Sequence, residues 1–278
     1  MMVKLIRTEM KRNLFTWSTL IAFLLFVALF VLGAEKFRPN TELGLERNSY
    51  NYFSAFLYTH GVGPKAILPI VFPFIIALLS GSSLALDRKT GYIEFILLRT
   101  TYKKYIFSKM IAASIISFLF VFIVEILCFL YLRISFHPPN SITEMEGYVP
   151  SFGHDLFTQS PFLYIFFIVL NTAILAVFIS LLSILLATWS KNVYIVMFAP
   201  FFIFIIGQLL FFALHINKFA PFELVGGYML NSFEYSLLEL PIILLFSLLI
   251  TSFLVYFRFS LKFKKGLQLY GKTKINSI

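Results

Sequence analysis

Six long apolar runs, separated by loops whose charges alternate in sign, constrain this chain more than any other feature. A hydrocarbon core about 30 Å thick is crossed by about 20 helical residues. A backbone inside that core must satisfy its own hydrogen bonds, so each run should be a helix. Of the 278 residues, 59% are hydrophobic and 13% charged, which a soluble domain of this size would not tolerate. The sequence therefore predicts an all-α integral membrane protein whose transmembrane domain, 14–257, has six transmembrane helices, over about 14–32, 67–86, 110–132, 162–189, 193–214 and 240–257.

The loop charges predict the orientation of these helices. If the helices alternate in direction, one side holds 17 of the 23 basic residues and the other side holds six. Short basic loops stay in the cytoplasm, so both termini are expected there, in a multi-pass protein of the plasma membrane. The net charge of +10 is then a topology signal, with attraction to the anionic lipid bilayer as a by-product. Nucleic-acid binding is not expected, because the basic residues flank membrane spans, as in the basic cytoplasmic tail 258–278, and form no separate domain.

Residues 1–13 precede the first span and have helical periodicity, with Val3, Ile6 and Met10 on one face and basic residues on the other. A basic amphipathic helix of this kind lies in the headgroup plane. The alternative is a frayed, positively charged flank that only sets the topology. The periodicity favours the interfacial helix.

The cytoplasmic connection 87–109 is the most distinctive segment outside the spans. Its pattern predicts two short amphipathic helices, over 92–98 and 102–107, with a turn between them. Ile93, Ile96 and Leu97 share a face of the first helix. This face must be covered by lipid, by another helix or by a partner protein.

The outer connections are read as loops, over 33–66 and 133–161, and the semi-apolar stretch 215–239 is expected to dip back into the outer leaflet. Within the second span, Pro73 is the candidate for a kink, since proline removes a backbone hydrogen bond and bends a helix.

Near the C-terminus, 266–273 matches the phosphate-binding pattern G-x-x-x-x-G-K-[ST]. Such a loop works when a strand delivers it and a following helix points its amides at the phosphates. Here a membrane span precedes the pattern and five residues follow it. We therefore expect no nucleotide site and expect Lys272→Ala to be tolerated.

Glu125 is the one formal charge well inside a predicted span, and ionisable residues in a membrane are functional candidates. The candidate residues of a transport path are Glu125, Asn171 and Gln208. The alternatives are structural pairing for Glu125, for instance with Arg133, and helix packing for the two amides.

Catalytic and metal-binding sets are not apparent in the sequence. The four histidines are assigned to outer loops or a helix end, and neither an HExxH pair nor a GxSxG elbow occurs. A serine nucleophile in Gly81-Ser82-Ser83 would need a histidine at a suitable depth on another span, and none is expected. Cys128, the only cysteine, offers no metal-binding pattern. We therefore expect no catalytic residue, cofactor or metal in this chain.

Four features together resemble the permease subunits of type-2 ABC transporters, a family of bacterial exporters. They are the basic N-terminal helix (Val3 to Asn13), the run Asp87-Arg88-Lys89-Thr90-Gly91-Tyr92-Ile93-Glu94, the pair Lys103 and Lys109 before the third span, and the segment Ala220-Pro221-Phe222 before the last. Thr100-Thr101 stand where this family often has a proline. The resemblance extends over the whole chain.

The resemblance implies a complex of two permeases, this chain with a second copy or a paralogue, and two cytosolic ABC ATPase subunits. ATP and Mg²⁺ would bind in those partners, because this chain has no ATPase domain. A coupling helix in the first cytoplasmic loop would dock on the ATPase. The residues assigned to it lie within Gly91 to Arg99: polar contacts from Glu94 and Arg99, an apolar face of Ile93, Ile96 and Leu97, and Gly91 at its start.

Two other classes of function remain open from the residues alone. One is a membrane-embedded enzyme, such as an intramembrane protease or a lipid-modifying enzyme. The other is a non-catalytic membrane scaffold. An ATPase that co-purifies in fixed stoichiometry would distinguish the permease from both.

Overall fold

The structure, a computed structural model, describes residues 2–35, 51–62, 67–136, 138, 152–216, 220–225 and 238–275, and most of their side chains up to residue 261. Within these ranges the chain forms helices joined by turns and short loops, and no strand. This confirms the all-α fold class. With several helices long and apolar enough to cross a bilayer, the chain is a multi-pass membrane protein.

The helices follow one another along the chain as α1 (Met2–Leu14), α2 (Trp17–Glu35), α3 (Tyr52–Leu57), η2 (Tyr58–Val62), α4 (Leu68–Lys89), α5 (Tyr92–Leu97), α6 (Tyr102–Ser135), α7 (His154–Gln159), α8 (Pro161–Trp189), α9 (Val193–Ala213), α10 (Pro221–Val225) and α11 (Glu239–Ile275). Five of them contain a candidate span: α2, α6, α8, α9 and the first part of α11, Glu239–Leu261. Helix α4 makes a sixth if its two straight parts, Leu68–Leu79 and Ser83–Lys89, are taken as one bent span.

The bend in α4 measures 45° and lies between Leu79 and Ser83. The bend is therefore not at Pro73, the predicted position of the kink, which lies within Leu68–Leu79. Glycine and serine pairs are another common cause of helix bends. A Cβ added at Gly81 would lie 2.8 Å from Cβ of Ser183 on α8. The bend therefore lies at Gly81, where the lack of a side chain lets α4 pack closely against α8.

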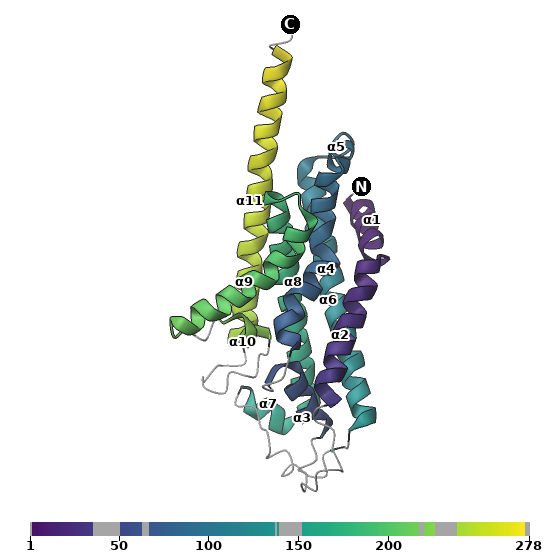
Figure 1. Cartoon of the computed structure of the whole chain (residues 1–278), viewed down its shortest axis with the longest axis vertical. Coiled ribbons are helices and arrows are strands. Elements are labelled where there is room, and N and C mark those ends of the chain that lie inside the picture. Colours follow the sequence, from purple (N-terminus) through teal and green to yellow (C-terminus); the bar gives the residue numbers. More distant parts are fainter. Residues whose placement is uncertain are drawn as a thin grey trace.

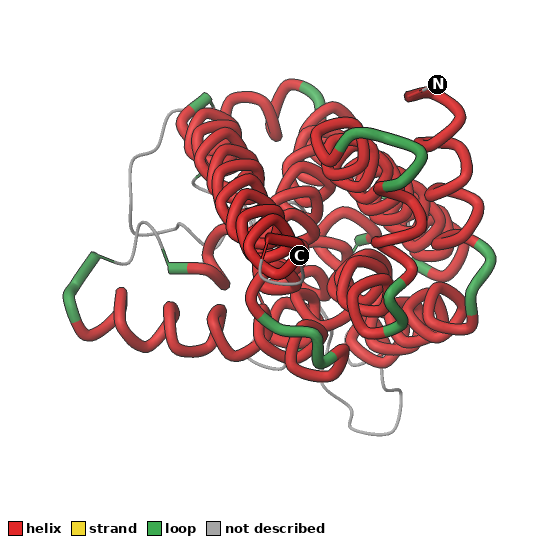
Figure 2. Tube along the Cα trace, turned by 90° about the horizontal axis from the view of Figure 1, so that it is seen from above, coloured by secondary structure: helices red, strands yellow, loops and turns green. Residues whose placement is uncertain are grey.

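Helix α8 is the centre of the bundle and packs against α4, α6 and α11. Of its most apolar window, 61% is buried, against 17% for α9. Figures 1 and 2 show α9 leaning out of the bundle, while α11 continues far beyond it. Helices α1 and α5 and the later part of α11 lie toward one end of the molecule, and α3 and α7 toward the other (Figure 1). We name these the α5 end and the α3 end.

Part of the segment predicted as the first outer loop, 33–66, is folded into the bundle. Residues 51–57, which include α3, are all buried, and so are Thr59 and His60 of the π-helix η2. Aromatic side chains explain this burial: Phe53 and Phe56 pack with Phe129 of α6 at centroid distances of 6.0 and 5.6 Å. Tyr52, Phe53 and Phe56 are therefore core residues rather than loop residues.

The ends of two helices differ from the predicted bounds. The segment 102–107, predicted as a separate short helix, is the beginning of α6, which runs unbroken to Ser135. Helix α11 runs to Ile275 instead of ending near 257, so the backbone over 266–273 is helical. Its amides then bond within the helix, and the phosphate-loop conformation is not formed.

About half of the predicted loop 133–161 lies outside the described residues, as does most of 215–239. Within the latter, α10 packs against α9, α4 and α8. The backbone N–H of Phe222 donates to Oε1 of Gln208 at 3.0 Å. Gln208, a candidate for the transport path, thus connects α9 to α10.

Candidate functional site at the junction of α1, α4, α5 and α6

Helix α5 is a single short helix between α4 and α6, at the end of the molecule where α1 also lies (Figure 1). It begins after Gly91, whose φ of 73° is in the left-handed region that favours glycine. The chain therefore turns sharply from α4 into α5 over two residues, Thr90 and Gly91. This confirms a short helix in the predicted place.

The side chains of α5 divide into two sets. Ile93, Ile96 and Leu97, the residues predicted to seat in a partner, are partly buried and pack against a core of this chain's own residues at the α5 end. Phe95 and Leu98 are exposed instead, at 68% and 85%. Glu94 and Arg99, the residues predicted to make polar contacts with a partner, are exposed, and Gly91 is partly buried in the turn. The face left for a partner therefore consists of Phe95 and Leu98 with Glu94 and Arg99.

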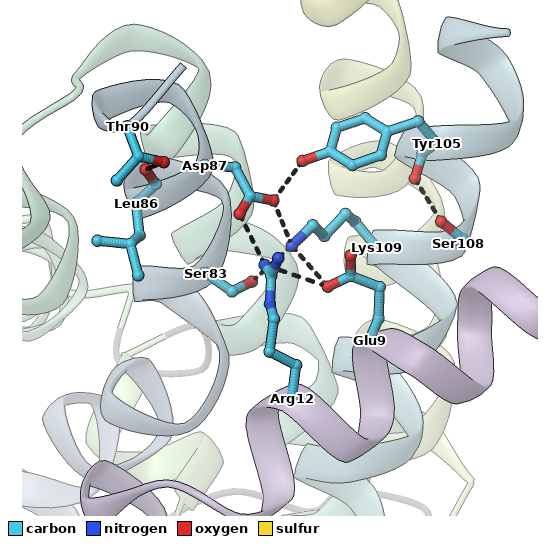
Figure 3. Close-up of polar contacts among 9 residues, drawn as sticks. All are labelled: Glu9, Arg12, Ser83, Leu86, Asp87, Thr90, Tyr105, Ser108 and Lys109. Carbon is cyan, nitrogen blue, oxygen red and sulfur yellow. Dashed lines mark hydrogen bonds and ion pairs between the residues drawn. The ribbon is translucent and has the colours of Figure 1, made fainter. Parts of the chain in front are cut away.

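A cluster of four charged side chains, Glu9, Arg12, Asp87 and Lys109, lies directly beneath α5, and we call it the ion cluster (Figure 3). Nζ of Lys109 lies 2.6 Å from Oε2 of Glu9 and 2.7 Å from Oδ2 of Asp87. Nη2 of Arg12 lies 2.8 Å from Oδ1 of Asp87 and 3.3 Å from Oε2 of Glu9. Two positive and two negative groups thus alternate, and their charges sum to zero.

The ion cluster is almost completely withdrawn from solvent. The side chains of Lys109, Asp87 and Glu9 are 1%, 3% and 6% exposed, and that of Arg12 is 33% exposed. The phenol of Tyr105 donates to Oδ2 of Asp87 at 2.6 Å. Buried charges are retained only when they are paired and hydrogen-bonded. The cluster therefore joins α1, α4 and α6 into one unit.

Helix α1 packs against the bundle with polar side chains. Its fully buried residues are Glu9 and Asn13, whereas Val3 is 77% exposed. Burial alone would lower the pKa of the Arg12 guanidinium. The hydrogen bond to Asp87 and the charges of Glu9 and Asp87 outweigh burial and raise that pKa above its ordinary value. A helix lies where the amphipathic one was predicted, and its place in the headgroup plane stays a prediction.

Arg12 also connects the cluster to α5, because its guanidinium carbon lies 5.5 Å from the centre of the Tyr92 ring. This distance is typical of a cation–π contact. On the other side of α4, Arg88 donates to the carbonyl of Ala187 and, at 3.3 Å, to that of Ser190, at the end of α8. A displacement of α5 would therefore reach α1 and α8 as well as the helices that flank it in sequence.

Glu125, a candidate residue of the transport path, is fully buried and faces η2. Its Oε1 lies 2.8 Å from Nε2 of His60, which is also fully buried, and Oγ1 of Thr172 on α8 lies 3.4 Å from the same nitrogen. The assignment of His60 to an outer loop is wrong, and Glu125 pairs with it rather than with Arg133, which contacts Phe162. Asn171 donates to the carbonyl of Phe167 one turn earlier on its own helix.

Thr172, His60 and Glu125 do not form a hydrolytic triad. In such a triad the base accepts from its nucleophile at one ring nitrogen and donates to the acid at the other. Here Thr172 and Glu125 both approach Nε2 of His60. Nε2 of His60 on η2 is instead the shared contact of α6, through Glu125, and α8, through Thr172. Glu125, Asn171 and Gln208 make three separate contacts, and their assignment to a transport path stays a prediction.

Sequence reasoning missed the ion cluster because its members are far apart along the chain and each sits where a charge is ordinary. One signal was available: Glu9 interrupts the basic N-terminal helix, and Asp87 begins the basic connection 87–109. An acidic residue among the basic residues of the predicted cytoplasmic side can indicate an ion pair. Among the described residues, no group of three His, Cys, Asp or Glu side chains is placed to hold a metal ion.

No family model matches this sequence, and neither a curated protein nor a solved structure shows a significant match to it.

Proposed function

We propose that this chain is the transmembrane permease subunit of a type-2 ABC transporter, an exporter of the plasma membrane that uses ATP hydrolysed by separate cytosolic subunits. The observation that carries the proposal is α5. It is a short helix outside the candidate spans that exposes apolar Phe95 and Leu98. Its Tyr92 contacts Arg12, a member of the buried ion cluster that joins α1, α4 and α6. A helix with exposed apolar side chains and rigid attachments suits the transfer of force from a partner to the spans.

The proposed assembly contains this chain, a second permease copy or a paralogue, and two ATPase subunits that bind ATP and Mg²⁺. The α5 end of the bundle would then face the cytoplasm, in agreement with its basic loops. Pushing on α5 would move α4 and α6, which follow it directly, and α1 through the ion cluster. Coupled motion of several spans is what an alternating opening requires.

Affinity purification of the full chain from native membranes tests the proposal. We expect an ABC ATPase to co-purify in a fixed ratio, and a preparation without one would contradict the proposal and favour a scaffold or an enzyme. Phe95→Asp and Leu98→Asp should abolish this co-purification, since they place a charge at the docking face without disturbing buried side chains. Tyr194→Asp, at a residue that is 70% exposed on α9, is the matched control.

A further inference from the structure

A cavity of about 510 Å³ lies between α1, the start of α2, α4 and α5, beside the ion cluster. This volume is within the range of small-molecule sites, roughly 300–1,000 Å³. Its buried lining includes polar Asn13, Ser83 and Asp87, which are 6%, 8% and 2% exposed, and apolar Leu79, which is 2% exposed. Leu86 and Phe95, which also line it, are 49% and 68% exposed. The cavity therefore has polar and apolar side chains in its depth and apolar side chains at its rim.

Two side chains in the cavity offer hydrogen-bond donors that the described part of the chain does not use. Both ion pairs of Arg12 involve Nη2, so the donors on Nε and Nη1 are available. The side-chain amide of Asn13 has no partner among the described residues, although its backbone carbonyl accepts from Thr16 and Thr19. A guanidinium beside an amide is suited to an acceptor-rich group such as a phosphate.

The position of the cavity identifies the source of that phosphate. Helix α1 is basic and ends at Leu14, and the apolar helix α2 begins at Trp17, which is 80% exposed. Tryptophan at the end of a span marks the level of the lipid headgroups. The apolar rim at this level would contact the glycerol and the first acyl carbons of a lipid. We propose that the cavity binds the headgroup phosphate of one phospholipid from the leaflet at the α5 end.

The charges around the cavity favour a zwitterionic headgroup. Because the ion cluster sums to zero, it offers no excess positive charge to a lipid with a net negative charge. Phosphatidylethanolamine carries its own ammonium, which can face the carboxylates. The lipid would contact the Arg12 guanidinium, which also lies over the ring of Tyr92. Binding of the lipid in the cavity would therefore affect the position of α5.

Titration of the purified full chain with phosphatidylethanolamine, followed by native mass spectrometry, tests this site. Thr90→Trp fills the rim, because Thr90 lines the cavity, is exposed and bonds only to the carbonyl of Leu86 one turn earlier, at 2.9 Å. Thr8→Trp is the matched control: Thr8 is exposed, bonds to the carbonyl of Lys4 at 2.9 Å and lies outside the cavity. Asn13→Leu removes the free amide without adding bulk.

We expect one phosphatidylethanolamine bound by wild type and by Thr8→Trp, and affinity about tenfold weaker or worse in Thr90→Trp and Asn13→Leu, as for the loss of one good polar contact. Equal affinity in all four proteins would overturn the site. Displacement of the lipid by excess inorganic phosphate would assign the cavity to a free phosphate instead. Equally tight binding of phosphatidylglycerol would overturn the preference for a zwitterion.

Discussion

At the scale of single residues, the molecule concentrates its charge in two buried groups that lie at different levels. The ion cluster is a balanced set of four side chains beneath α5, and the pair of His60 and Glu125 lies deeper in the bundle. Removing one member of a buried pair leaves the other charge uncompensated, which costs far more than removing both. Even conservative substitutions at these positions should therefore lower the stability of the protein strongly.

Asp87→Asn tests the ion cluster. Lys109 and Arg12 would share one acid instead of two, and breaking such a buried pair costs about 3–5 kcal/mol. We expect a clearly lower melting temperature of the purified protein in detergent, followed by tryptophan fluorescence. Glu94→Gln, at an exposed acid on α5 with no ion pair among the described residues, should melt like wild type. A similar melting temperature for both variants would show that the cluster is not stabilising.

A double-mutant cycle tests the deeper pair. Glu125→Leu alone leaves the buried His60 without its closest partner, at a cost of about 1–3 kcal/mol or more. His60→Leu combined with Glu125→Leu removes both polar groups, so we expect the double variant to be more stable than Glu125→Leu. Additive losses in thermal unfolding would mean that the 2.8 Å contact carries no coupling.

At the scale of elements, two glycines decide how helices meet. Gly81 lets α4 touch α8, and Gly91 turns the chain from α4 into α5. The two positions demand glycine for different reasons, since Gly81 has no space for a side chain, whereas nothing lies within 4 Å of a Cβ at Gly91. The first is a packing requirement and the second a backbone requirement.

Gly81→Ala should separate α4 from α8, because its new Cβ would lie 2.8 Å from Cβ of Ser183. Overpacking of this kind costs about 1–3 kcal/mol. Ser183→Gly in the same chain removes the clashing atom and should restore much of the lost stability in thermal unfolding. Absence of any rescue would place the cause elsewhere than in this contact.

Gly91→Val should distort the start of α5, because a β-branched residue at a φ of 73° is strained by about 1–2 kcal/mol. Asparagine tolerates this conformation, so Gly91→Asn should be milder. Under the proposed function, we expect ATPase co-purification to fall in Gly91→Val and to persist in Gly91→Asn. Equal behaviour of the two variants would show that the turn does not set the orientation of α5.

At the scale of the whole molecule, six crossings would place the α5 end and the α3 end on opposite sides of the membrane. Exposed Lys191 and Lys103 lie in segments near the first end, and exposed Asp155 lies in α7 at the second. In a Cys128→Ser background, we expect cysteines at 103 and 191 to react with a membrane-impermeant reagent only from the cytoplasmic side. A cysteine at 155 should react only from outside, and labelling of 155 and 191 from one side would contradict the six-span topology. Asn140 and Asn231, the natural loop positions for this test, lie outside the described residues.

The sequence by itself determined that the chain is a helical membrane protein, where most of its spans begin and end, and that a short helix connects α4 to α6. These properties depend on local composition: an apolar run long enough to cross the bilayer forms a helix whatever its neighbours are. Only the tertiary structure decided which face of α1 is buried, that α3 and η2 enter the bundle, that α4 bends at Gly81, and that Glu9 meets Lys109 and His60 meets Glu125. These depend on contacts between residues distant in sequence, where a charge is stabilised by a partner that no local pattern reveals.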